Sequence, residues 1–202
     1  MTIKDRRARH KKATRDSILA AALQIAKDEG WGAVTIRRVA DVIDYSAPII
    51  YEYFASKDAL LEELQDHGFA LLTEALLKVQ AEDVDPKEKL LRFGDAYIVF
   101  AYESPELYHQ IMHGWNRAAD SLETTLQRAT AVAGIVHECL TAWEIEAKIV
   151  DLDQEAVADI AWALLHGLVS VEMMGRFRGG EDRVRQLARQ TLNDLLTSWA
   201  QK

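Results

Sequence analysis

Two histidines, His109 and His113, stand four positions apart in the segment YHQIMHGW. On a helix this spacing puts both imidazoles on one face, from which they could bind a single zinc ion. The zinc-protease form of the pattern has a glutamate directly after the first histidine, and here Gln110 occupies that position. Because Cys139 is the only cysteine, no cage of thiolates supports a metal. We therefore expect no metal and no cofactor, and we expect both histidines to lie at a pocket wall or on the surface.

Other catalytic patterns are missing from the sequence. It contains no phosphate-binding loop, no Gly-x-Ser-x-Gly motif and no Ser/His/Asp arrangement. The lone Cys139 lies in a helical pattern, where a cysteine is usually a small buried hydrophobe. We therefore expect that the chain is not an enzyme.

The segment DYSAPIIYEYFASKDAL, residues 44–60, carries hydroxyl groups, aromatic rings and a lysine that suit contacts with nucleic acid. At helical spacing Ile50 and Phe54 point toward neighbouring helices and can fill a core. Tyr51 can reach a backbone phosphate through its hydroxyl, and Lys57 can add a charge-assisted phosphate contact at a helix N-terminus. A DNA groove is the simplest explanation for the outward-facing side chains, Ser46, Ala47, Ile49 and Tyr53.

Helices must position these residues, because the apolar pattern has a helical period nearly everywhere. Residues suited to helix N-caps precede the apolar runs, namely Thr14, Thr35, Ser56, Asp85, Ser104 and Asp153. We predict an all-α protein of about nine helices, at residues 14–29, 35–42, 46–52, 56–81, 86–102, 105–115, 119–144, 153–178 and 181–200. The helices at 35–42 and 46–52, joined by a short turn, have the spacing of a helix-turn-helix, whose second helix enters a major groove.

Charge is unevenly distributed along the chain. Residues 1–57 hold 11 Lys and Arg against 7 Asp and Glu, a net charge of +4, whereas residues 58–202 hold 13 against 25, a net charge of −12. A basic module on an acidic body is typical of a DNA-binding module attached to a domain of different function, although a solvated basic tail gives the same count. We expect a disordered basic arm that adds phosphate or minor-groove contacts through Lys4, Arg6, Arg7, Arg9, Lys11 and Lys12.

Residues 14–64 resemble the TetR family of bacterial transcriptional regulators. The resemblance rests on TRDSILAAALQIAKDEGW, AVTIRRVADVIDYS and APIIYEYFASKDALLEEL, and its most specific part is the Tyr-x-x-Phe-x-Ser-Lys-x-x-Leu ending. It implies a three-helix DNA-binding domain followed by a larger helical domain that dimerises and often binds a small molecule. It also implies contacts with phosphate and sometimes a base from Thr35 and Arg37, and a phosphate contact from Lys57. The implied recognition-helix contacts are Ser46, Ala47, Pro48, Ile49, Tyr51 and Tyr53.

The turn and the recognition helix depart from the family pattern. Asp44 and Tyr45 stand where the family has glycine and a small aliphatic residue, and the turn survives if Asp44 adopts the left-handed conformation that Asp tolerates. Glu52 would be repelled by phosphates unless it accepts a hydrogen bond from a cytosine amino group. Because Ala47 and Ile49 offer no hydrogen bonds, we expect contacts with thymine methyl groups and readout of DNA shape.

The segment AWALLHGLVSVEMMGRF resembles the tryptophan-histidine-glycine domain found at the C-terminus of one subset of the family. Trp162 and His166 are four positions apart and share a helix face. Gly167 inside a helix costs about 1 kcal/mol relative to alanine, which indicates close approach of another helix. That helix could belong to a second subunit or to the core of the same subunit.

The segment AYIVFAYESPELY is apolar nearly all round, so we expect its helix at the centre of the C-terminal bundle. Aromatic side chains in this half of the chain could line an apolar cavity between helices, or they could be ordinary core. The candidate ligand-binding residues are Phe93, Tyr97, Phe100, Tyr108, Met112, Trp115, Trp143, Trp162 and His166.

These features divide the chain into a basic flexible arm at 1–13, a helix-turn-helix domain at 14–60 and a ligand-binding and dimerisation domain at 61–202. We predict a homodimeric repressor that a small apolar or aromatic ligand releases from a near-palindromic operator in double-stranded DNA. The alternative is an all-helical ligand-binding protein or small enzyme without DNA binding. No run of about 18 apolar residues and no signal-peptide pattern occurs, so we expect a cytoplasmic protein without a membrane span.

Overall fold

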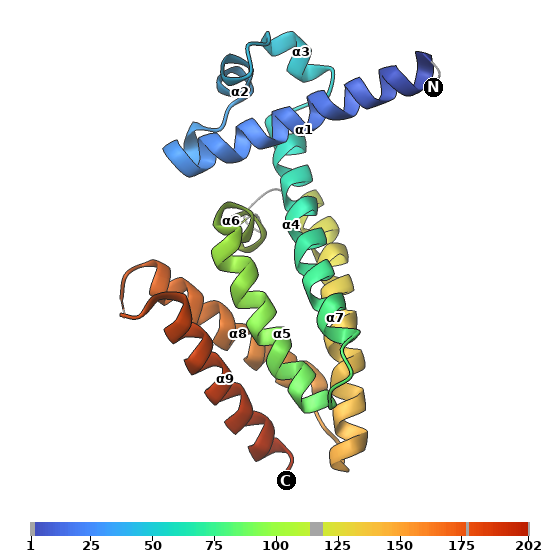
Figure 1. Cartoon of the computed structure of the whole chain (residues 1–202), viewed down its shortest axis with the longest axis vertical. Coiled ribbons are helices and arrows are strands. Elements are labelled where there is room, and N and C mark those ends of the chain that lie inside the picture. The colour runs from blue at the N-terminus through green and yellow to red at the C-terminus, as the bar shows by residue number, and fades with distance from the viewer. Residues whose placement is uncertain (1–2, 114–118, 177, 202) are drawn as a thin grey trace.

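The computed structural model describes residues 3–113, 119–176 and 178–201, and this part of the chain holds nine α-helices, one 3₁₀ turn and no strand. The predicted all-α fold, with an N-terminal helix-turn-helix domain and a C-terminal helical domain, is confirmed. Figure 1 shows α1 to α3 gathered at one end of the long α4. The elements are α1 (Ile3–Glu29), η1 (Trp31–Ala33), α2 (Ile36–Val42), α3 (Ala47–Tyr51), α4 (Lys57–Gln80), α5 (Pro86–Glu103), α6 (Pro105–His113), α7 (Ala119–Ala147), α8 (Gln154–Met173) and α9 (Gly180–Trp199).

Four of the predicted caps close the N-termini of their helices. A side-chain oxygen of each cap accepts a hydrogen bond of 2.9 to 3.1 Å from the backbone N–H three residues later, which satisfies one of the donors that a helix start leaves unpaired. The four caps are Thr35, Ser56, Asp85 and Asp153. The starts of α2, α4, α5 and α8 therefore lie within one residue of the predicted positions.

The first helix begins at Ile3, whereas we expected it to begin near Thr14 after a disordered arm. The segment before Thr14 contains neither glycine nor proline, so nothing in it breaks a helix. The Thr14 hydroxyl does not cap the helix but donates to the carbonyl oxygen of His10 at 3.1 Å, one turn earlier. The basic segment is therefore the first part of a helix of 27 residues.

The helix α8 ends at Met173, five residues before the predicted end at 178. Gly175 has a φ of 67°, a left-handed conformation that glycine adopts without strain. The next N–H, that of Arg176, donates to the carbonyl oxygen of Val171 at 3.1 Å, which closes the end of the helix. The glycine after the predicted apolar run thus ends this helix before the Gly179-Gly180 pair is reached.

The three N-terminal helices share a small core. Ile18 and Ile25 from α1, Val39 from α2 and Ile50 from α3 are at most 2% exposed, and Phe54 closes the same cluster. The prediction that Ile50 and Phe54 point inward is therefore confirmed. A five-residue helix such as α3 cannot hold itself together, so this packing fixes its orientation.

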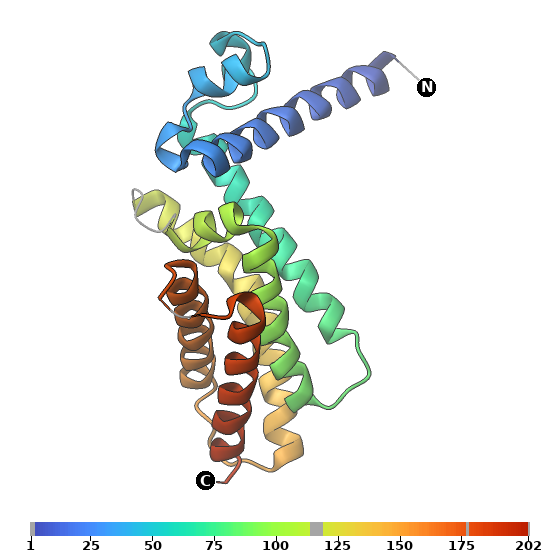
Figure 2. The ribbon, with the colours of Figure 1, turned by 60° about the vertical axis from the view of Figure 1, so that its left-hand side comes forward.

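The C-terminal helices surround α5, as predicted for that apolar segment. It contacts α4, α6, α7, α8 and α9, and Figure 2 shows it between the neighbouring long helices. Arg189 of α9 donates to Glu88 of α5 at 2.6 Å and reaches Asp95 at 3.4 Å, so charges at the edge of α5 also fix the last helix. This bundle forms the larger part of the protein.

The helix α8 is long and apolar enough to cross a membrane, the one such helix in the described part of the chain, although we expected none. Only 17% of its most apolar stretch is buried, although α5, α7 and α9 pack against the helix. Ile160, Val171 and Met174 are 45%, 39% and 71% exposed. The apolar character of α8 thus exceeds what packing within one chain requires.

The turn between α2 and α3 gives a test of the fold. Asp44 has a φ of 56°, so Asp44→Gly should leave the protein more stable than Asp44→Ala by about 1 kcal/mol, since alanine strains in that conformation. At Asp41, inside α2, the order should reverse, because glycine costs about 1 kcal/mol relative to alanine in a helix. Urea unfolding of the four variants measures both differences, and the same order at both positions would contradict the turn geometry.

Candidate nucleic-acid interface and ligand cavity

The helix α3 turns most of its predicted contact residues to solvent. Ser46 and Pro48 are exposed, and Ile49 and Tyr51 are 36% and 55% exposed. Ala47 and Tyr53 are half-buried and pack partly against the core. The outer side of α3 therefore carries two hydroxyls and a large apolar surface at the end of the molecule, which suits insertion into a DNA groove.

The turn before α3 has the geometry expected of its sequence. Asp44 adopts the left-handed conformation, and the N–H of Tyr45 donates to the carbonyl oxygen of Ala40 at 2.9 Å. Tyr45 is 37% exposed, so it offers a further aromatic ring beside α3. Sequence reasoning treated Tyr45 as a departure from the family pattern and missed this exposure, because only the turn decides where its ring points.

Near the start of α2, one arginine forms no salt bridge among the described residues. Thr35 is exposed, and its side-chain oxygen accepts from the N–H of Arg38 as the helix cap. Arg38 pairs with Glu29 at 2.6 Å, whereas Arg37 is exposed and makes no salt bridge among the described residues. Of the two neighbouring arginines, Arg37 is therefore the one available to a phosphate.

Lys57 is the first residue of α4, directly after the cap Ser56. Its half-buried side chain forms no salt bridge in the described part of the chain. A helix N-terminus carries partial positive charge and unpaired N–H groups, so Lys57 and the helix start attract the same anion. The predicted phosphate contact therefore fits its surroundings.

Arg15 connects α1, the exit of α3 and α4, a role that sequence reasoning missed. Its Nη1 donates to the carbonyl oxygen of Tyr53 at 2.9 Å, and its Nε donates to Oε1 of Glu63 at 2.6 Å. The guanidinium lies 4.4 Å from the centre of the Phe54 ring. Hydrogen bonding to Glu63 raises the pKa of Arg15, so the guanidinium stays charged. The position of Arg15, three residues before buried Ile18, was the available sequence signal.

Trp31 and His109 join the N-terminal helices to α6. Their rings stack with centres 6.3 Å apart and planes inclined by 20°. His109 was a candidate metal ligand, and the described residues contain no group of three side chains that could hold a metal ion. The side chain of His113 lies outside the described structure.

An apolar cavity of about 360 Å³ lies between α4 and the helices that follow it. A volume of this size fits the range of small-molecule sites, which are mostly apolar with few polar groups. Four candidate ligand-binding residues line it, namely Phe93, Tyr97, Met112 and Trp162. Sequence reasoning missed Phe69, Leu72 and Leu76 of α4, Leu165 of α8, and Leu192, Leu196 and Trp199 of α9. Their helical spacing marks an inward face but does not distinguish a core from a cavity.

Tyr97 lines the cavity and begins a chain of polar contacts through Tyr108 and His166, two candidate ligand residues that are not among its lining residues. The Tyr97 hydroxyl points at the Met112 sulfur at 3.8 Å, and the Tyr97 and Tyr108 rings meet edge to face with centres 5.9 Å apart. The Tyr108 hydroxyl lies 2.8 Å from Nδ1 of His166, whose ring stacks on Trp162 at 5.6 Å. Burial raises the pKa of Tyr97 and of Tyr108, so both hydroxyls remain neutral donors at ordinary pH. A ligand in the cavity would meet a mostly apolar wall with few polar side chains, among them Tyr97, Asp159 and Trp162.

The remaining candidate ligand residues lie elsewhere. Phe100 is buried on another side of α5, beside the groove that α4 and α5 form with Leu71 and Val79. Trp143 is 3% exposed in the core and does not line the cavity, and Trp115 lies outside the described residues. Burial raises the pKa of the Cys139 thiol to about 11, which fits a small hydrophobe rather than a nucleophile.

Comparison with known families identifies both parts of the chain. Residues 18–64 match the family described as "Bacterial regulatory proteins, tetR family". Residues 90–195 match the family described as "Tetracyclin repressor-like, C-terminal domain".

Two curated proteins are similar in sequence. The HTH-type transcriptional repressor NicS of Pseudomonas putida is 31% identical over 84 residues, which span 42% of this chain and 40% of that protein. The HTH-type transcriptional regulator Rv0681 of Mycobacterium tuberculosis, itself described as uncharacterized, is 27% identical over 169 residues, 83% of this chain and 74% of that protein.

Solved structures share the fold. The TetR family regulator PfmR from Thermus thermophilus has a TM-score of 0.69 and 21% identity, over 89% of this chain and 96% of that one. The fatty acid degradation regulator FadR from Bacillus halodurans has a TM-score of 0.76 and 16% identity, over 89% and 94%. At these identities the likeness shows the arrangement of helices.

The cavity gives a prediction of its own. Ala161→Leu should raise the dissociation constant of the apolar fluorophore N-phenyl-1-naphthylamine about tenfold, because forcing extra methyl groups into a filled site costs about 1–3 kcal/mol. Ala142→Leu, an exposed position of α7 away from the cavity, is the matched control. Fluorescence titration measures both, and equal affinities for the two variants would place the fluorophore outside the cavity.

Proposed function

Because the chain belongs to the TetR family of bacterial regulatory proteins, we propose that it is a homodimeric repressor released from a near-palindromic operator by a small apolar or aromatic ligand. Membership makes it a DNA-binding transcriptional regulator with a ligand-binding C-terminal domain, and not an enzyme. The sequence likeness to NicS, a repressor by name, favours repression. Since such a regulator acts where the chromosome is, we place it in the cytoplasm.

The observation that carries this proposal is the outward face of α3. Ser46, Ile49 and Tyr51 point to solvent at the far end of the molecule, with Arg37 and Lys57 on the flanking helices. This arrangement suits a recognition helix in a major groove between two rows of phosphates. The full set of proposed DNA contacts is Thr35, Arg37, Ser46, Ala47, Pro48, Ile49, Tyr51, Tyr53 and Lys57.

The exposed face of α8 supports dimerisation. Ile160, Val171 and Met174 follow one another at helical spacing with Gly167 among them, and all three apolar side chains are exposed. A methyl group added to Gly167 would meet no atom within 4 Å, so its missing side chain serves no packing inside the described chain. A second copy packed through α8 and α9 would cover this stripe, and two recognition helices would then reach successive major grooves.

Ligand control follows from the position of α6. This helix carries Met112 at the cavity and His109 against Trp31. A ligand that requires another position of Met112 therefore disturbs the contact with the DNA-binding domain. Its effect is limited to its differential affinity for the two arrangements of the domains.

We further propose that the C-terminal domain belongs to the tryptophan-histidine-glycine subset of the family. The support is the stacking of Trp162 on His166 beside the open face at Gly167.

Lys57→Ala tests the DNA-binding mode. The variant should bind duplex DNA more weakly at every sequence, and the slope of log affinity against log salt should fall by about 0.9 for each phosphate that the lysine neutralises in the wild-type complex. Lys78→Ala, in the last turn of the same helix and paired with Glu74, removes the same charge and should leave the slope unchanged. Fluorescence anisotropy on a duplex selected from genomic DNA measures both slopes. An unchanged slope for Lys57→Ala would remove this lysine from the interface.

Val171→Arg tests the dimer. Arginine in an apolar interface loses its hydration without a partner, which costs several kcal/mol, so the variant should sediment as a monomer and lose affinity for the operator. Ile145→Arg replaces a side chain that is 73% exposed on α7 and should remain a dimer. A Val171→Arg protein that still sediments as a dimer would move the interface away from α8.

A further inference from the structure

The face of α1 that packs against the other N-terminal helices changes character along the helix. Ile18, Ala22 and Ile25 are buried on this face. Beyond Thr14, steps of three and then four residues toward the N-terminus bring Lys11 and Arg7 to the same face, where they replace the apolar residues. Over its first turns, this face of α1 is therefore cationic and not apolar.

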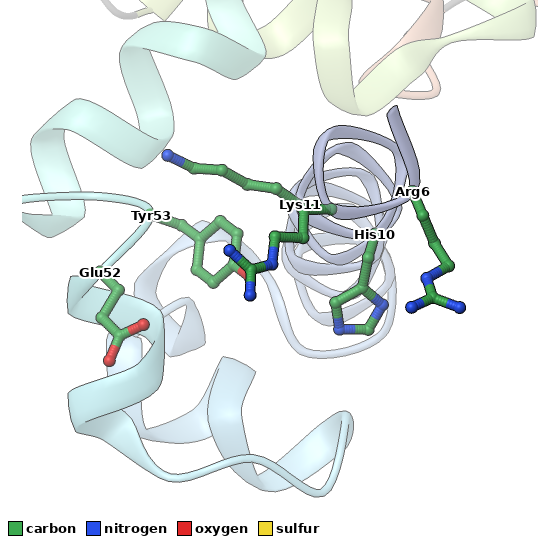
Figure 3. Close-up of a pocket in the computed structure, with 6 residues that line it drawn as sticks. Arg6, His10, Lys11, Glu52 and Tyr53 are labelled. Atoms are coloured by element: carbon green, nitrogen blue, oxygen red, sulfur yellow. The ribbon is translucent and has the colours of Figure 1, made fainter. Parts of the chain in front are cut away.

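These cations line an open cleft of about 580 Å³ between α1 and the end of α3 (Figure 3). Arg6, Arg7, His10 and Lys11 come from α1, while Glu52 and Tyr53 directly follow α3. With His10 neutral, three positive charges face one negative charge, so the cleft is net positive. The carboxylate of Glu52, which alone would repel a phosphate, thus shares the cleft with arginine and lysine side chains.

The basic residues are also badly placed for an isolated helix. A helix N-terminus carries partial positive charge and is stabilised by acidic side chains, yet Asp5 is the single acidic residue in the first turn. Like charges four positions apart, such as Arg7 and Lys11, repel one another further. A closely spaced row of negative charges would relieve both effects.

We propose that this cleft binds the phosphate backbone of duplex DNA beside the half-site that α3 reads, with Arg7 and Lys11 as its main phosphate ligands. The inference rests on the proposed DNA-binding function and adds a second contact region to it. Glu52 and Tyr53 continue directly from the recognition helix, which favours DNA over an acidic protein as the occupant of the cleft.

Because this segment is helical, it favours contacts with DNA phosphates over insertion into the minor groove. A helix with its side chains is about 10–12 Å across, whereas the minor groove of B-DNA is about 6 Å wide, so α1 cannot enter it as a flexible arm would. Figures 1 and 2 show these first turns projecting beyond the three-helix core. From Ile3 to Thr14 the helix rises about 17 Å, the length of about five base-pair steps, so it can lie along flanking phosphates.

The test compares Arg7→Gln/Lys11→Gln with Arg9→Gln/Lys12→Gln. Both variants remove two positive charges from the same helix, but Arg9 and Lys12 do not line the cleft. Glutamine is a good helix former, and circular dichroism checks that both variants keep their helix content. Anisotropy titrations use a genomic duplex selected by the wild-type protein, in its full length and trimmed to the two half-sites.

On the full-length duplex, Arg7→Gln/Lys11→Gln should reduce the salt slope by about 1.8 per protomer and weaken binding about tenfold or more, because each neutralised phosphate contributes about 0.9 to the slope. Because the segment is a helix and not a flexible arm, the proposal limits the phosphate contacts expected of all six of its cations to those that line the cleft. The control pair should therefore keep the wild-type salt slope, and the trimmed duplex should not distinguish the variants. Equal losses for both pairs, or a loss that persists on the trimmed duplex, would overturn the proposal. If the wild-type protein selects no duplex, the proposed function itself is wrong. If Lys57→Ala weakens binding but Arg7→Gln/Lys11→Gln does not, the proposed function stands and only the cleft proposal is wrong.

Discussion

The unbroken helix α4 is the constraint on which the rest of the structure depends. This helix of 24 residues begins at Lys57, beside α3, and ends at Gln80 in the C-terminal bundle. On the way Phe69, Leu72 and Leu76 form part of the cavity wall. Because a hydrogen-bonded helix transmits displacement along its axis with little bending, the end of α4 beside α3 and the wall of the cavity are mechanically coupled. Arg15 attaches α1 to this helix through Glu63 and holds the exit of α3 through the Tyr53 carbonyl.

A second connection runs through α6. Its inner side packs close to α4, since a methyl group on Gly68 would come within 3.0 Å of Ile111. Its outer end stacks His109 on Trp31, and Met112 reaches the cavity. The N-terminal helices thus rest on two supports, α4 and α6, and both line the cavity. Under the proposed function, a ligand that changes the distance between these supports would change the tilt of α3 and thereby control a DNA contact that the ligand does not touch.

Two exposed surfaces of the chain have a chemistry that favours contact with another molecule. The stripe of Ile160, Val171 and Met174 on α8 is apolar and exposed, and burying apolar area is the main favourable term in association. The first turns of α1 are cationic around an open cleft. The two surfaces call for different partners, an apolar helix and a polyanion. Their separation on opposite parts of the fold lets one protomer bind both at once.

The sequence by itself determined the all-helical class, the starts of α2, α4, α5 and α8 with their caps, and the inward face of α3, because these depend on local hydrogen bonds and on helical periodicity. Thr35, Ser56, Asp85 and Asp153 cap their helices as their types predict, and Asp44 takes the left-handed turn. Only the tertiary structure decided which aromatic residues surround the cavity. Phe93 and Phe100 are both buried residues of α5, yet only Phe93 lines it, because the neighbouring helices leave a space on one side alone. The role of Arg15 and the cleft beside Tyr53 likewise arise from residues far apart in the chain, whose meeting no local pattern specifies.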